Sequence, residues 1–344
     1  MKGRTIILSL VIVSIFSLIS CRKSSSTQNN ENNINKGNKI VRLATATTNA
    51  VIGGVGGVAQ EKKFIEDELS KIGYEVKYIN FPAAGPAINE AFVSEEIEFA
   101  DYGNLPPVVL KSKGVDISII GVTDTNVVID LLVQKDSNIK SVNDLKGKKV
   151  IVGKGTIYQQ YFNNLIKRNG VEVKDIEVIN SVAEAQSTFL SKSVDAYITS
   201  SIGAKLLEGQ GNGKIIESSL NTPELSSETV LVGRNKYIKE NPKVAVALLK
   251  AYIRAQEFAR NNSNEAYKIF SNVGVDEGII RDIYGVDNGK FENFTIEISQ
   301  DTQKKIKNLS TFLKDEGLIS KDINVDELID NSYFEKAKKE LEEK

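Results

Sequence analysis

Residues 149–166 read KVIVGKGTIYQQYFNNLI, and this stretch decides the class of fold. Its first four residues form a short β-rich run, and the next four form a turn that contains two glycines. The remainder carries the i, i+3, i+4, i+7, i+8 stripe of a core-facing helix, made of Tyr158, Tyr161, Phe162, Leu165 and Ile166. A strand, a turn and a core-facing helix in this order are the repeating unit of an α/β protein.

The same alternation continues on both sides of this stretch. We expect further strands at 40–46, 75–81, 98–102, 115–123, 127–134, 176–179, 196–199 and 228–233. We expect helices at 60–72, 87–94, 182–191 and 201–210, and a mainly helical remainder from 241 onward. Such alternation builds mainly parallel sheets covered by helices on both faces, and the length of the chain predicts two α/β lobes.

The first 20 residues have the pattern of a signal peptide. Two basic residues precede an apolar run at 6–19, which is shorter than the roughly 20 residues that span a bilayer. The run ends in LISC, and Cys21 is the only cysteine of the chain. This ending resembles the bacterial lipobox, in which the cysteine sulfur receives a diacylglyceryl group. We therefore expect a signal peptide at 1–20 and lipidation at Cys21, rather than a buried structural cysteine.

The segment after Cys21 has the composition of a tether. Residues 22–39 read RKSSSTQNNENNINKGNK, with Ile34 as the one apolar residue. Such a segment buries too little apolar surface to offset the entropy of ordering it, so we expect 21–38 to be flexible. Acyl chains contribute roughly 0.8 kcal/mol per buried methylene, so they would hold the protein on the membrane, facing the extracytoplasmic side.

Composition excludes several classes of function. Removing residues 1–20 takes away two basic residues and no acid, which changes the formal net charge from −1 to −3. This balance argues against a nucleic-acid partner, whose binding needs a basic face. The chain has no histidine and one cysteine, which excludes disulfides, the usual zinc sites and His-dependent nucleophilic catalysis. We expect no metal, no cofactor and no catalytic residue.

Two glycine-rich segments approach nucleotide-binding motifs without meeting their spacing. GVGGVA at 54–59 fits G-x-G-x-x-A, but it lies too far from the preceding expected strand for the tight turn of a dinucleotide fingerprint. We interpret it as a loop whose backbone amides approach a ligand. GKGT at 153–156 lacks the first glycine of a P-loop and has Gly155 where Ser or Thr is required. It still opens a helix, whose free amides and positive dipole end suit an anion.

A series of motifs in fixed order resembles one family of proteins. The segments are FPAAGP at 81–86, EFADYGNLPP at 98–107, VNDLKG at 142–147, GKGT at 153–156 and SVDAY at 193–197. Their order and spacing are similar to those of the substrate-binding proteins of ABC importers for aliphatic sulfonates, taurine and nitrate, the NMT1-like family. The likeness covers roughly 40–270, and the series is more specific than any one of its members.

The resemblance implies a two-lobed periplasmic-binding-protein fold of type II, with each lobe a mainly parallel sheet flanked by helices. We expect lobe 1 at 39–130 and 231–344 and lobe 2 at 131–230, so that the chain crosses the hinge twice. Two crossings allow the lobes to close on a ligand with little change inside each lobe.

The resemblance also implies ligand contacts at the carboxyl ends of strands and the starts of helices. In lobe 1 the expected contacts are Thr47, Thr48, Asn49, Ala84, Gly85, Asn104 and Leu105. In lobe 2 they are Gly155, Thr156, Tyr158, Thr199, Ser200 and Ser201. The alternative to ligand contact is that the glycines serve only the geometry of turns. Hydroxyls at the starts of helices are as often helix caps as ligand donors.

One departure from the family concerns the head group of the ligand. Sulfonate and taurine binders tend to read Trp-Asp-Pro-Tyr where this chain has TSSI at 199–202, and no arginine stands at any expected contact. An oxoanion would be held by backbone amides, hydroxyls and Lys154 instead of a guanidinium fork.

The expected function is that of an extracytoplasmic solute-binding lipoprotein. It captures a small polar or anionic ligand, such as a sulfonate, taurine or nitrate, and delivers it as a monomer to the permease subunits of an ABC importer. The alternatives are an enzyme on the same scaffold, for example one related to pyrimidine precursors with Asp101 or Glu228 as acid or base, and a sensor lipoprotein.

Overall fold

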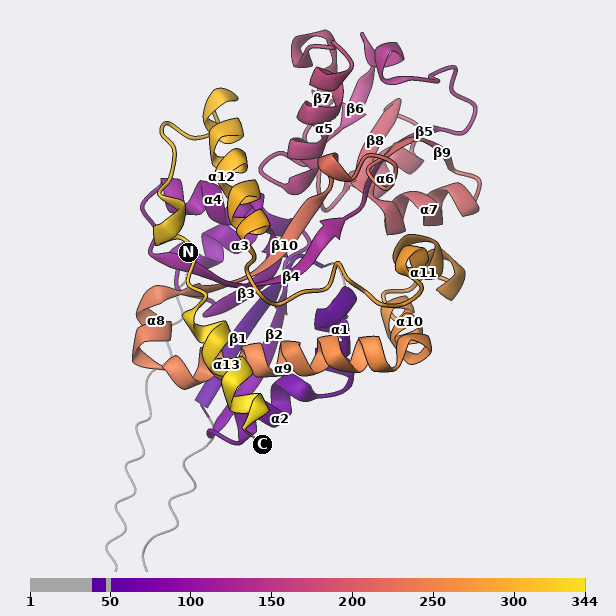
Figure 1. The fold of residues 1–344 in the computed structure, drawn as a ribbon. Helices are drawn as coiled ribbons and strands as arrows, with labels where there is room; N and C mark the ends of the chain where they lie inside the picture. The colour runs from indigo at the N-terminus through magenta and orange to yellow at the C-terminus, as the bar shows by residue number, and fades with distance from the viewer. Residues whose placement is uncertain (1–38, 48–50, 344) are drawn as a thin grey trace, which may run out of the picture. The chain divides into compact units, whose positions relative to one another are not determined.

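The computed structural model describes residues 39–47 and 51–343. The expected signal peptide, the tether with its lipidation site at Cys21, and the ligand contacts Thr48 and Asn49 lie outside the described residues. The described residues form one compact unit, which contains two five-stranded sheets flanked by helices. We call the part built on the first sheet lobe 1 and the part built on the second sheet lobe 2 (Figure 1).

The sheet of lobe 1 has the order β2-β1-β3-β10-β4. Its strands are β1 (Lys39–Thr45), β2 (Tyr74–Asn80), β3 (Phe99–Gly103), β4 (Ile117–Val127) and β10 (Ser227–Arg234). β1 pairs in parallel with β2 and β3, whereas β10 lies antiparallel between β3 and β4. The parallel strands need crossover helices, which is the arrangement that the strand–helix alternation predicts.

The sheet of lobe 2 repeats this arrangement. It has the order β7-β6-β8-β5-β9, and its strands are β5 (Ile129–Gln134), β6 (Lys149–Ile151), β7 (Glu177–Ile179), β8 (Ala196–Ser200) and β9 (Gly213–Ser218). β6 pairs in parallel with β7 and β8, and β5 is antiparallel to both β8 and β9. The fourth strand of each sheet, β10 in lobe 1 and β5 in lobe 2, is antiparallel to its neighbours. Each of these strands begins directly after the chain has crossed from the other lobe. The α/β class and the two-lobed fold that we expected are confirmed.

Both crossings lie slightly earlier in the chain than we expected. β5 begins at Ile129, so residues 129–130 belong to lobe 2. Residues 227–230 belong to lobe 1, because β10 pairs along its length with β3 and β4. Val230, Leu231 and Val232 are all fully buried in β10, so the strand fills the gap between its neighbours as one unit.

The helices of lobe 2 cover its sheet as the apolar stripes predict. They are α5 (Ile157–Arg168), α6 (Ala185–Leu190) and α7 (Ser201–Gly209). The stripe of α5 is buried except for Tyr158, which is partly buried, and Tyr161 is fully enclosed and Leu165 3% exposed. Each such side chain contributes about 1.5–3 kcal/mol through its burial. The strand β9 follows α7 and has no counterpart among the expected elements.

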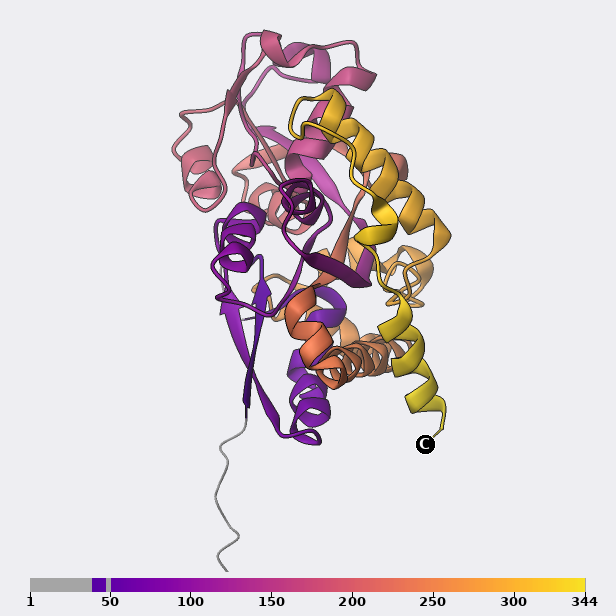
Figure 2. The ribbon, with the colours of Figure 1, turned by 90° about the vertical axis from the view of Figure 1, so that its left-hand side faces the viewer.

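The helices of lobe 1 come from both ends of the described chain. They are α1 (Gly54–Glu61), α2 (Phe64–Ser70), α3 (Ala84–Val93), α4 (Leu105–Ser112), α8 (Asn235–Glu240), α9 (Pro242–Asn261), α10 (Ser263–Ser271), α11 (Glu277–Tyr284), α12 (Gln300–Asp315) and α13 (Ser332–Glu342). The long helix α9 packs against α1, α2 and α13, and α12 packs against α4 (Figures 1 and 2).

The glycine-rich segment at 54–59 is a helix, not the loop that we expected. α1 begins at Gly54, and its residues 55–59 are buried. A Cβ at Gly56 would lie 2.6 Å from Cγ2 of Ile52, and one at Gly57 would meet the Ile52 carbonyl. The glycines therefore allow the backbone to pack closely in the core. The expected helix at 60–72 is divided at Lys63, whose φ of 56° interrupts the helical hydrogen bonding.

Candidate ligand site between the lobes

A cavity of about 280 Å³ lies between the lobes, at the carboxyl ends of β1, β3 and β8. Lobe 1 provides most of its wall, and lobe 2 provides the starts of α5 and α7. The lining residues are Thr45, Ala46, Thr47, Ile52, Gly53, Gly54, Val55, Gly56, Ala84, Gly85, Asp101, Tyr102, Gly103, Pro106, Thr123, Asp124, Val127, Thr156, Ile157, Tyr158, Ser200, Thr229, Tyr284 and Phe294. In open α/β sheets a ligand binds at this end of the strands.

Several of the expected ligand contacts line this cavity. They are Thr47, Ala84, Gly85, Thr156, Tyr158 and Ser200. The others that the structure describes do not line it, namely Asn104, Leu105, Gly155, Thr199 and Ser201. Leu105 is fully buried in the core. Asn104 is 2% exposed, and its backbone amide donates a hydrogen bond to the backbone carbonyl of Glu228. Thr199 lies beside Ser200 in β8, where successive side chains point to opposite faces.

The turn at 153–156 uses its hydrogen-bonding groups within the protein. The Lys154 amide donates to Oδ1 of Asn180 at 2.9 Å, and the Gly155 amide donates to Oε1 of Gln159 at 2.7 Å. The Thr156 hydroxyl donates to the Gly153 carbonyl at 2.7 Å and accepts from the Tyr158 amide, so it caps α5. These groups are not free for an anion, contrary to our expectation from the sequence. Lys154 is exposed and does not line the cavity.

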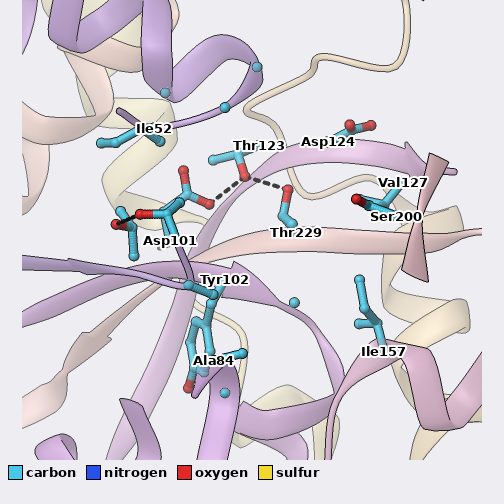
Figure 3. A pocket seen from close by; sticks show the side chains of 18 of the residues that line it. Ile52, Ala84, Asp101, Tyr102, Thr123, Asp124, Val127, Ile157, Ser200 and Thr229 are labelled. Carbon is cyan, nitrogen blue, oxygen red and sulfur yellow. Dashed lines mark hydrogen bonds between the residues drawn. The ribbon is translucent and has the colours of Figure 1, made fainter. Parts of the chain in front are cut away.

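Asp101 is a partly buried carboxylate in the cavity wall. Its Oδ1 accepts a hydrogen bond of 2.7 Å from the Thr123 hydroxyl, and its Oδ2 accepts one of 3.0 Å from the Tyr252 hydroxyl. The Thr123 and Thr229 hydroxyl oxygens lie 2.8 Å apart, so Thr123 stands between Asp101 and Thr229 (Figure 3). Burial raises the pKa of Asp101 from 3.8 to about 6, and the two hydrogen bonds oppose this rise.

Asp124 is the second carboxylate of the cavity, and a β-bulge brings it there. Thr229 pairs with Asp124 and Val230 pairs with Val122, so β4 has one extra residue at Thr123. A bulge changes the direction of side chains, and here both Thr123 and Asp124 line the cavity. The Asp124 Oδ1 accepts hydrogen bonds from the Asn126 amide at 2.8 Å and from Asn293 Nδ2 at 2.9 Å.

The environment of Asp124 disfavours its charged form. Its pKa is raised from 3.8 to about 7, chiefly by burial. The hydrogen bonds from Asn293 and the Asn126 amide oppose this rise, and the nearby carboxylates of Asp101 and Glu228 add to it. Among the residues that the structure describes, neither cavity carboxylate has an ion pair. The cavity wall therefore contains two carboxylates that the surrounding protein does not neutralise.

Several lining residues gave no signal as ligand contacts in the sequence. Tyr284 and Phe294 lie far along the chain in a region that reads only as helical, and the fold brings them to the cavity. Asp101 stood out only as a candidate acid or base, and alternation along β3 places it on the cavity face. The other candidate, Glu228, is buried, forms an ion pair of 3.3 Å with the exposed Lys305, and does not line the cavity.

The lobes fit closely at one point on the rim of the cavity. Gly103 ends β3 in lobe 1, and Ile157 begins α5 in lobe 2. A Cβ at Gly103 would lie 2.6 Å from Cγ2 of Ile157, which is too short for any real contact. Glycine at 103 is therefore required for the lobes to come together as they do here.

Comparison with known proteins identifies the family. The profile described as NMT1/THI5 like matches residues 58–266, more than half of the chain, so the protein belongs to this family. A Bacillus subtilis protein named for binding aliphatic sulfonates is 28% identical over 286 residues, which cover 82% of this chain and 84% of that protein.

Solved structures share the fold. The sulfonate-binding protein SsuA of Methylobacillus flagellatus superposes with a TM-score of 0.73 at 27% identity, over 89% of this chain and 96% of that one. The desulfurization enzyme DszB, solved with biphenyl-2-sulfinic acid, superposes with a TM-score of 0.68 at 15% identity, over 88% of this chain and 99% of that one. At that identity the likeness to DszB concerns the fold alone.

Proposed function

We propose that this protein captures a small polar or anionic solute between its lobes and delivers it to the permease subunits of an ABC importer. The observation that carries the proposal is the cavity of about 280 Å³ lined from both lobes, in a chain of the NMT1/THI5-like family. A cavity of this size encloses a small metabolite, and hinge motion between two lobes is the usual way in which binding proteins take up and release a ligand. The relatives named for sulfonates support a ligand of that size.

The protein acts at the extracytoplasmic side of the membrane, attached through lipid on Cys21. The support for this anchor is the signal-peptide pattern at 1–20, the LISC ending and the polar tether at 21–38. Within residues 39–47 and 51–343, no helix has the length and apolar character needed to span a bilayer. A tethered monomer can reach the permease while it stays on the membrane.

Binding is favoured over catalysis as the role of the cavity. The relatives reported above with more than 25% identity are binding proteins, whereas DszB shares the fold alone. The chain has no histidine, and Glu228 is held by Lys305 away from the cavity. Asp101 and Asp124 have no nucleophilic side chain of cysteine or lysine beside them among the lining residues.

A binding screen followed by an uptake assay tests this function. The purified protein is heated with a library that contains taurine, alkanesulfonates, nitrate, pyrimidine precursors and small carboxylates. A ligand at 100 times its Kd adds about 2.7 kcal/mol of stability, which a thermal shift detects. We expect at least one solute to stabilise the protein, to shrink its radius of gyration in small-angle scattering, and to enter cells more slowly when the gene is deleted. A library in which no solute does so contradicts the proposed function.

A further inference from the structure

The cavity has a charge opposite to the one that a sulfonate or nitrate ligand requires. Among the lining residues, which all belong to the described part of the chain, there are two carboxylates, Asp101 and Asp124, and no lysine or arginine. Asp101 is partly buried with only hydroxyl partners, and Asp124 is 7% exposed with only amide partners. A bare oxoanion in this cavity would meet the charge of Asp101, and that of Asp124 wherever Asp124 is ionised, and no basic side chain of the wall would offset either.

Three of the groups that the sequence offered to an anion are already engaged. The amides of Lys154 and Gly155 and the hydroxyl of Thr156 are bonded within lobe 2. The first turn of α1 also faces the cavity, but Asp101 occupies the space beside it, since a Cβ at Gly56 would lie 3.1 Å from Asp101 Oδ2. The positive end of this helix dipole is thus opposed by a carboxylate of the protein itself.

The hydroxyls of Thr123 and Thr229 form a hydrogen-bonded chain that begins at Asp101. The Thr123 hydroxyl has one hydrogen, and with Asp101 ionised this hydrogen goes to Asp101 Oδ1. Thr229 then donates to Thr123 across the 2.8 Å separation, which leaves the lone pairs of the Thr229 oxygen for a ligand. Both recorded hydrogen bonds of Asp124 fall on Oδ1, so its Oδ2 is the oxygen that remains for a ligand. This side of the cavity needs a ligand that donates hydrogen bonds.

We propose that the solute of this protein carries a protonated nitrogen group, an amine or an amidinium, which binds between the carboxylates of Asp101 and Asp124. This proposal rests on the proposed function and narrows the class of solute. A solute that also has an anionic end, as taurine does, satisfies it through its ammonium group, whereas nitrate and simple alkanesulfonates do not. The ring walls of Tyr284 and Phe294 provide apolar surface for the rest of the molecule.

Four probes with the same ring and different head groups test this proposal. Benzamidine is cationic, benzamide is neutral, and benzoate and benzenesulfonate are anionic. Their affinities for the full-length protein are measured by calorimetry at neutral pH. We expect benzamidine to bind at least about tenfold more tightly than either anion, with benzamide between them.

Variants assign the preference to the two carboxylates. Asp101→Asn and Asp124→Asn keep the size of the side chain and its acceptor oxygen but remove the charge, and each is expected to weaken benzamidine binding by at least about tenfold. Asp136→Asn is the matched control, because Asp136 is exposed in the turn after β5 and should leave all affinities unchanged. Melting curves show whether each variant is folded. Because Asp101→Asn and Asp124→Asn are both made, the proposal can still be tested if one of them misfolds.

The outcomes separate this proposal from the proposed function. Benzoate or benzenesulfonate binding as tightly as benzamidine overturns the cationic head group, and so does undetectable benzamidine binding at millimolar concentration. Unchanged benzamidine affinity in both Asn variants overturns the assignment to Asp101 and Asp124. In each of these cases a solute from the library that binds and closes the lobes leaves the proposed function standing.

Discussion

Replacing Asp124 with asparagine should stabilise the ligand-free protein, and the gain should be larger at pH 8 than at pH 5. The Asp124 carboxylate is buried, and its pKa is raised from 3.8 to about 7, chiefly by burial. The folded state therefore binds a proton more tightly than the unfolded state does. The stability that this proton contributes is complete below pH 3.8 and is lost as the pH rises through about 7.

The size of the effect follows from the two pKa values. Each unit of difference corresponds to about 1.4 kcal/mol, so the full loss between the protonated and the ionised limits is about 4 kcal/mol. Roughly 2–3 kcal/mol of this loss falls between pH 5 and pH 8, because at pH 5 the unfolded aspartate is already mostly ionised. Asparagine does not titrate, and its Oδ1 can keep the hydrogen bonds from the Asn126 amide and Asn293.

Urea unfolding at the two pH values measures this difference. The chain has no tryptophan, so far-ultraviolet circular dichroism reports the transition. The gap in unfolding free energy between Asp124→Asn and the wild type should widen by roughly 2–3 kcal/mol from pH 5 to pH 8. The control variant Asp136→Asn should show the same gap at both values. A gap for Asp124→Asn that stays constant or narrows with rising pH would refute the reasoning, because the carboxylate would then not be disfavoured by burial.

Three further predictions concern closure, capping and anchoring. Gly103→Ala should weaken binding of a library solute by about 1–3 kcal/mol, because its Cβ would lie 2.6 Å from Ile157, and adding Ile157→Ala should restore the affinity. Unchanged calorimetric affinity in Gly103→Ala would mean that the lobes do not close as they do here. Thr156→Val should lower the unfolding free energy by about 1 kcal/mol through loss of the α5 cap, a result that an unchanged urea midpoint would contradict. Cys21→Ser should abolish incorporation of a radioactive fatty acid, and label retained by this variant would contradict a lipid anchor at Cys21.

Local pattern predicted most of the fold. The apolar stripe from Tyr158 to Ile166 predicted α5, and β-rich runs predicted nine of the ten strands in approximately their observed places. These elements follow from the period of apolar residues within a few turns of chain, which the sequence displays directly. The glycines at 54–59 predicted a loop beside the ligand, but they form the start of α1, which lines the cavity. Close packing of Gly56 and Gly57 against Ile52 is a core contact that the local pattern does not reveal.

The site depended on tertiary structure to a greater degree. The order of the motifs predicted several ligand contacts that do line the cavity, namely Thr47, Ala84, Gly85, Thr156, Tyr158 and Ser200. It also predicted Leu105 as a contact, which lies in the core. Sequence spacing does not reveal that Asn180 and Gln159 occupy the amides of the 153–156 turn.

The sequence by itself determined the order of strands and helices, the two lobes and the absence of histidine chemistry. Only the tertiary structure decided the electrostatic character of the cavity. Tyr252 reaches Asp101 across 151 positions of the chain, and Asn293 reaches Asp124 across 169. A bulge in β4 turns Asp124 to the same cavity. The charge that a ligand meets depends on which groups burial and distant hydrogen bonds bring together, and local periodicity carries no information about those partners.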